Sequence, residues 1–242
     1  MCDSQFVSSS HFFIRSADRE DLWNSTPSKF RINLQKSLKG SKAQISYAQL
    51  AATYYNITQY NNKINAGLGS NPSTLITITP GCYTLNELLQ ALQTDLSFLG
   101  TVSITFSQIT NLITISNSVA FSLDTNIENS LSVAIGFPPA QYLNNTSFTA
   151  TFIPKVFDNA IYISCNFATA IQTSTSKLHN ISFVIPHTAN KNEIIQYYAS
   201  THFALQPRVQ NQTLGYLEFS VFDERGNLLQ GLGDWCLMLE II

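Results

Sequence analysis

Short runs of alternating hydrophobic and polar residues dominate the sequence, and turn residues separate almost all of them. A period of two places one face of a strand toward a core and the other toward solvent. Many short strands separated by turns are typical of an antiparallel sandwich or barrel. The pattern predicts strands at 29–35, 43–50, 53–60, 74–80, 102–107, 112–117, 148–154, 159–166, 178–186 and 196–205, with two more at 216–221 and 235–242.

The last of these runs, Trp235 to Ile242, is apolar on both faces. Its odd positions carry Trp, Leu, Leu and Ile, and its even positions carry Cys, Met, Glu and Ile. A strand of this kind is typical of positions buried on both faces and paired on both edges. We therefore expect this run to be an inner strand of the sandwich.

One segment, PGCYTLNELLQALQTDLSFLG, breaks the strand pattern. Thr84 and Glu87 have the spacing of a capping box, and five leucines follow at helical spacing (Leu85, Leu88, Leu89, Leu92 and Leu96). A hairpin, VSITFSQITNLITIS, comes next, and then a short second helix at Leu131 to Ile135 that Gly136 would end. This order predicts a compact α+β unit at 72–140, large enough to fold as a small domain.

The strands before and after this unit number roughly eight, which is the count of a jelly roll. The predicted fold class is mainly β, a single jelly-roll β-sandwich with an inserted small α+β domain. Residues 1–71 would form an N-terminal arm and the first strands, 72–140 the insert, and 141–242 the remaining strands.

The composition favours a subunit of an assembly over a free monomer. Hydrophobic residues make up 44% of the chain, which is ample for a core, but charged residues make up only 12%, against about 25% in ordinary soluble domains. Much of the surface must therefore be Asn, Gln, Ser and Thr, which a partner can cover without burying an unpaired charge.

The positive charges are unevenly placed. Seven of the thirteen basic residues lie in one N-terminal stretch, namely Arg15, Arg19, Lys29, Arg31, Lys36, Lys39 and Lys42. This basic cluster is either a solvated strand edge and loop or a contact with an anionic partner. No basic residue lies between Lys63 and Lys155, which argues against a specific nucleic-acid site in the middle of the chain.

The candidate chemistry is sparse. The four cysteines (Cys2, Cys82, Cys165 and Cys236) are scattered, which favours reduced thiols, and the four histidines (His11, His179, His187 and His202) lack metal-ligand spacing. A Cys165 nucleophile with His187 or His202 as its base has no support beyond composition. The chain is expected to have no catalytic residues, cofactor or metal, no transmembrane segment and no signal peptide, and so to be synthesised in the cytosol and not secreted.

A series of motifs resembles the minor capsid, or penton, proteins of virophages and Polinton-like viruses in its order. The series is SADREDLWNSTPSKFRINL, ITITPGCYTLNELLQALQ, ITFSQITNLITIS, LSVAIGF, NAIYISCN and LEFSVFDERGNLLQGLGDWCLMLEI, and it covers nearly the whole chain. The resemblance implies a single jelly roll that closes the five-fold vertices of an icosahedral virion capsid as a homopentamer, with a double-jelly-roll major capsid protein as partner. The basic cluster would then face the capsid interior or neighbouring proteins.

Two other functions fit parts of the sequence. A receptor-binding spike or fibre head would share the β-rich, low-charge character, although such a protein usually has a shaft or repeat. A carbohydrate-binding jelly-roll module or enzyme would need clustered carboxylates or exposed tryptophans, and the chain has only two tryptophans.

Overall fold

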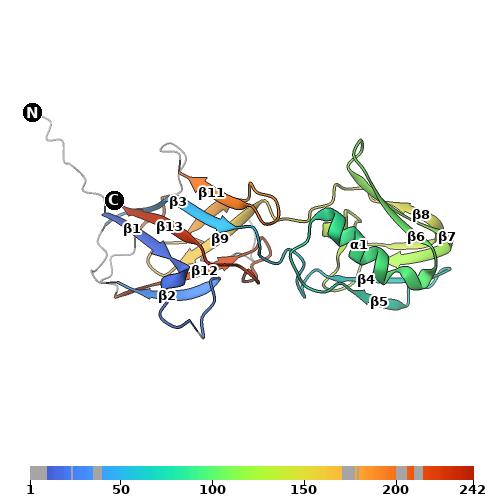
Figure 1. Cartoon of the computed structure of the whole chain (residues 1–242), viewed down its shortest axis with the longest axis horizontal. Helices are drawn as coiled ribbons and strands as arrows, with labels where there is room; N and C mark the ends of the chain where they lie inside the picture. Colours follow the sequence, from blue (N-terminus) through green and yellow to red (C-terminus); the bar gives the residue numbers. More distant parts are fainter. Residues whose placement is uncertain are drawn as a thin grey trace, which may run out of the picture. The chain divides into compact units, whose positions relative to one another are not determined.

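The computed structural model describes residues 10–22, 24–34, 40–170, 178, 180–199, 206–209 and 215–242. The chain forms two compact units (Figure 1). Unit 1 comprises Met1–Tyr54 and Asp158–Ile242, and unit 2 comprises Tyr55–Phe157. Unit 1 therefore carries the blue and red ends of the colour bar, and unit 2 its middle.

Unit 1 is a sandwich of two four-stranded antiparallel sheets. The first sheet has the order β1-β13-β3-β11, and the second has the order β10-β9-β12-β2. The strands of the first sheet are β1 (Ser10–Arg15), β13 (Cys236–Ile241), β3 (Ala43–Ala51) and β11 (Ile194–Tyr198). Those of the second are β10 (Phe183–Pro186), β9 (Ala160–Cys165), β12 (Tyr216–Phe222) and β2 (Lys29–Asn33).

The strand pairing is that of a jelly roll. Taken in chain order within unit 1, the first strand pairs with the last, the second with the seventh, the third with the sixth and the fourth with the fifth. Such a set of pairs is one long antiparallel ribbon rolled into two sheets, which is the double Greek key of a jelly roll. The predicted fold class, a jelly-roll sandwich with an inserted α+β unit, is confirmed.

The core of the sandwich lies between the two sheets. Phe30 of β2 stacks on Phe219 of β12 with ring centroids 5.4 Å apart, and Trp235 meets Phe30 edge-on at 5.6 Å. Leu237 and Leu239 of β13 are fully buried from the first sheet. The alternation in the sequence arises because every second residue of each strand points into this layer.

The expectation of an inner last strand is confirmed. β13 pairs with β1 on one edge and with β3 on the other, both antiparallel. Its even residues, Cys236, Met238 and Glu240, lie on the outer face and are partly buried.

Unit 2 is a five-stranded sheet covered by a helix. Its elements are β4 (Lys63–Leu68), β5 (Thr74–Thr77), α1 (Leu85–Asp95), η2 (Ser97–Leu99), β6 (Val102–Ser107), β7 (Leu112–Asp124), α2 (Ser132–Ile135) and β8 (Gln141–Thr149). β7 is the longest strand and pairs with β6 and β4 along one edge and β8 along the other. α1 lies against this sheet (Figure 1), and its buried leucines share a core with strand residues such as Ile64 and Ile115.

α1 begins and α2 ends where the sequence predicts. The Thr84 hydroxyl accepts a hydrogen bond from the Glu87 backbone, and the Glu87 carboxylate accepts one from the Thr84 backbone, which completes the capping box. α2 ends at Gly136 in the left-handed region at φ 74°. A Cβ at Gly136 would lie 2.1 Å from the Phe152 carbonyl oxygen, so the position also requires glycine for close packing.

The boundaries of the inserted unit differ from the range 72–140 that the sequence predicts. β4 and β8 lie outside that range, yet both pair with β7 and belong to unit 2. The predicted strand 53–60 is absent. That segment is instead a loop in which Asn56 hydrogen-bonds the backbone of Tyr83 in both directions, and Asn61 bonds the backbone of Asn56 and Thr58. Asparagine side chains thus form the hydrogen bonds with the backbone that a neighbouring strand would otherwise have formed.

Removing the inner strand should abolish folding. Deletion of residues 237–242 removes the partner of both β1 and β3 and exposes the sandwich core, so we expect insoluble protein. The matched control is Met238→Ser, which alters only the outer face of the same strand and should stay soluble. Expression and circular dichroism melting test this, and a soluble deletion variant with a cooperative melt would show that β13 is dispensable.

Unit 2 should fold when expressed alone as residues 55–157, because its helix and sheet bury a core of their own. A dispersed heteronuclear NMR spectrum is the expected result. The shorter fragment 72–140 lacks β4 and β8 and should give a collapsed spectrum. A random-coil spectrum from 55–157 would contradict the prediction.

Candidate interaction surfaces

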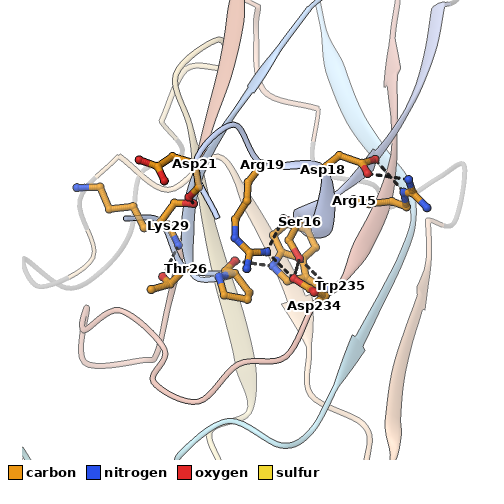
Figure 2. A network of polar contacts seen from close by, with 11 residues as sticks. Arg15, Ser16, Asp18, Arg19, Asp21, Thr26, Lys29, Asp234 and Trp235 are labelled. Atoms are coloured by element: carbon orange, nitrogen blue, oxygen red, sulfur yellow. Dashed lines mark hydrogen bonds and ion pairs between the residues drawn. The ribbon is translucent and has the colours of Figure 1, made fainter. Parts of the chain in front are cut away.

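Five residues of the basic cluster fall within the described part of the chain, namely Arg15, Arg19, Lys29, Arg31 and Lys42; Lys36 and Lys39 lie outside it. The structure brings Lys29 and Arg31 together, because both line one groove on the second sheet. Each of the three arginines contacts a carboxylate of unit 1, as Figure 2 shows for Arg15 and Arg19.

Two arginines are paired at the surface. Arg15 bonds Asp18 of the short helix η1 (Ser16–Asp18) at 2.6 and 2.8 Å, and this hydrogen bond lowers the pKa of Asp18 and raises that of Arg15. Arg31 is paired with Glu20, which raises the pKa of Arg31, and its guanidinium lies 4.5 Å from the centroid of the Tyr216 ring. Both guanidinium charges are therefore partly compensated within unit 1.

Arg19 belongs to a polar network that ties the end of β1 to the start of β13 (Figure 2). Its guanidinium donates to Asp234 at 2.7 Å and to the Ser16 carbonyl at 2.8 Å. The buried Ser16 hydroxyl donates to Asp234 at 3.0 Å and accepts from the Trp235 backbone at 2.9 Å. Only 12% of the Arg19 side chain is exposed, so this residue is part of the fold.

Lys29 and Lys42 differ from the arginines. Both are exposed, and neither ammonium forms an ion pair within the part of the chain that the structure describes. Lys42 lies directly across an isolated antiparallel bridge from Arg208, so two cations are neighbours there. These positions, and not the arginines, leave positive charge available to a partner.

The outer face of the first sheet carries an apolar row that crosses all four strands. Phe13 of β1 faces Met238 of β13, Met238 faces Tyr47 of β3, and Tyr47 faces Tyr198 of β11. Phe13 is 56% exposed and Tyr198 67% exposed, and the Tyr47 and Tyr198 rings are 5.2 Å apart. We call these four residues the aromatic row.

Two further rows flank the aromatic row. On one side, Cys236, Gln49 and Gln196 lie beside Arg15, with a groove of about 350 Å³ next to them. On the other side, Glu240 accepts a hydrogen bond from Gln44 at 2.6 Å and lies 3.7 Å from His11. Every charged group on this face therefore has a polar partner, and the face is apolar at its centre.

The outer face of the second sheet has the opposite character. A groove of about 620 Å³ is lined by three carboxylates and two cations (Glu20, Asp21, Glu218, Lys29 and Arg31) together with Asn24, Ser25 and Thr26. The two sides of the sandwich thus present different surfaces, one apolar and one charged.

The described residues hold no cluster of three or more His, Cys, Asp or Glu side chains that could bind a metal. Cys165 is buried, and burial raises the pKa of its thiol well above the usual value, so it is a poor nucleophile. Burial also lowers the pKa of His187, and His202 lies outside the described residues. Within the same part of the chain, no helix combines the length and apolar character needed to cross a bilayer.

The architecture defined by these observations is a single jelly roll that carries an α+β unit between its third and fourth strands. A solved structure of the mavirus penton protein is similar in fold, with a TM-score of 0.54 at 9% sequence identity over 96% of this chain and 99% of that chain. The Sputnik virophage structure aligns with a TM-score of 0.42 at 10% identity over 96% of this chain and 97% of that chain. No protein-family model and no curated protein sequence matches the chain.

The likeness to the mavirus protein establishes the fold, and the resemblance to virophage penton proteins that the motif order predicts is confirmed at that level. The aromatic row has no counterpart in the sequence predictions. The alternation places Phe13, Tyr47, Tyr198 and Met238 on strands, but only the register between distant strands brings them together.

Arg19 should matter for stability and Lys29 should not. Arg19→Gln removes two charge-assisted hydrogen bonds at a nearly buried site and is expected to lower the free energy of unfolding by about 1–2 kcal/mol. Lys29→Gln should change it by less than about 0.5 kcal/mol. Chemical denaturation measures the free energy of unfolding of both variants. Equal effects of the two substitutions would contradict the conclusion that Arg19 stabilises the fold and Lys29 does not.

Proposed function

We propose that this protein is a structural component of a viral capsid, and specifically a penton subunit that closes the five-fold vertices. The observation that carries the proposal is the agreement in fold with the mavirus penton protein along 96% of this chain and 99% of that one. The low charge of the chain supports the proposal, because a partner can cover the polar surface without burying unpaired charged side chains.

A ring with one copy at each position needs two different faces on every subunit, because its contacts are heterologous. The two sides of the sandwich meet that requirement, since one is apolar and the other charged. We assign the aromatic row to the contact with a neighbouring copy of this chain. Arg15 and Glu240 are already partnered, so covering this face leaves no unpaired charge.

The size of the face fits a weak contact that gains strength in a ring. Four strands about 4.8 Å apart and about six residues long span roughly 400 Å². A stable pairwise interface needs about 800 Å² from each partner. Two copies would therefore not stay together through this face alone, whereas a closed ring holds each copy at two sides. Pentamers should form at high concentration or in the presence of the double-jelly-roll major capsid protein.

The basic cluster has a divided role in this proposal. Arg15, Arg19 and Arg31 stabilise unit 1 through their carboxylate partners. Lys29 and Lys42, with Lys36 and Lys39, contact neighbouring capsid proteins or the anionic interior of the particle, and this contribution weakens as salt shortens the Debye length. The protein acts without enzymatic activity, is made in the host cytosol and is located in the virion.

Co-expression with the major capsid protein, followed by mass photometry and particle imaging, tests the proposal. We expect pentamers, located at the vertices. Tyr198→Ser removes the most exposed ring of the aromatic row and should lower the association constant of each contact at least tenfold, which corresponds to about 1.4 kcal/mol per contact.

The control is Tyr60→Ser, which truncates an exposed tyrosine of unit 2 and should leave assembly unchanged. Equal losses from both substitutions would reject the aromatic row as the contact while leaving the penton role intact. A stable trimer, or particles whose vertices close without this protein, would reject the penton role itself.

A further inference from the structure

Unit 2 contains a groove whose lining is polar but carries no charge. The groove has a volume of about 820 Å³ and lies where the C-terminal half of α1 meets the start of β6. Its lining residues are Gln90, Gln93, Thr94, Ser97, Gly100, Thr101 and Val102. This set offers two side-chain amides and three hydroxyls, and one aliphatic side chain.

The groove is built on a fixed backbone. The buried face of α1, with Leu88, Leu92 and Leu96, holds the helix against the sheet and leaves Gln90, Gln93 and Thr94 on its exposed side. At the turn into β6, the buried Asn117 donates to the Leu99 carbonyl at 2.9 Å, and Gly100 donates to the Ser97 carbonyl at 3.0 Å. Gly100 has a φ of 109°, which only glycine adopts without strain.

The polar groups of the groove are available to a ligand. Within the described residues, the side-chain amides of Gln90 and Gln93 form no hydrogen bond with the protein, and both residues are exposed. The Thr94 hydroxyl donates to the Gln90 carbonyl at 2.9 Å, which leaves its lone pairs free to accept. Amides and hydroxyls both donate and accept, and so do the hydroxyls of a sugar.

We propose that this groove binds a neutral oligosaccharide. Nothing in the groove would favour a charged ligand, because no lining residue is ionised. Unit 2 as a whole carries two lysines and four carboxylates over its 103 residues from Tyr55 to Phe157, so no strong field steers an ion toward it. A peptide would need apolar pockets for its side chains, and Val102 is the one aliphatic residue of the lining.

An open groove of this kind binds a single sugar chain weakly. If the chain assembles as proposed above, five copies at one vertex would present five grooves, and avidity would compensate for the weak single-site affinity. The binding site itself needs only one copy of the chain, so its test does not depend on whether pentamers form.

The test is NMR titration of the full-length protein with four neutral trisaccharides, namely maltotriose, cellotriose, mannotriose and triacetylchitotriose, up to tens of millimolar. We expect at least one of them to shift the side-chain amide signals of Gln90 and Gln93. The double variant Gln90→Ala, Gln93→Ala keeps strong helix formers on the exposed face and should weaken binding at least tenfold. Gln108→Ala, in the turn between β6 and β7, is the matched control and should bind as the unmodified protein does.

Several outcomes would overturn the proposal. These are the absence of shifts with all four sugars, shifts that map outside the groove, and binding that the double variant leaves unchanged. Shifts produced by a blocked polar peptide such as acetyl-Ser-Gly-Asn-amide, but by none of the sugars, would also overturn it in favour of a peptide ligand.

Discussion

β13 pairs with β1 along one edge and β3 along the other, and this double pairing holds unit 1 together. It brings residues near both ends of the sequence into one sheet, and the other three strand pairs of the rolled ribbon follow from the same arrangement. The network of Arg19, Ser16, Asp234 and Trp235 continues the β1 to β13 pairing beyond the ladder. The aromatic row exists because Met238 lies between Phe13 and Tyr47 in this pairing.

Unit 2 is added to this frame without interrupting it. The insertion lies between β3 and β9, after the first three strands of the ribbon, and brings a core of its own around α1 and β7. Each unit can therefore specialise. Unit 1 presents two unlike faces, one apolar and one charged, and unit 2 presents a neutral polar groove that plays no part in holding the jelly roll together.

Local signals in the sequence were sufficient for features that depend on neighbouring residues. The capping box at Thr84 and Glu87, the left-handed Gly136 and the doubly apolar β13 are examples. The aromatic row and the Arg19 to Asp234 pair, separated by 215 residues, depend on register between distant strands, which alternation does not encode. The predicted strand at 53–60 is wrong because asparagine side chains hydrogen-bond the backbone there. The residues alternate as in a strand, but no neighbouring strand pairs with them.

The two connections to unit 2 leave from different sheets of the sandwich, since β3 belongs to the first and β9 to the second. Both are inner strands, flanked by β13 and β11 in one sheet and by β10 and β12 in the other. A pulling force on unit 2 would therefore be shared between two sheets and resisted by four strand ladders at once. An attachment of this kind tolerates mechanical load far better than a domain appended to a terminal edge strand, which could be peeled away one hydrogen bond at a time.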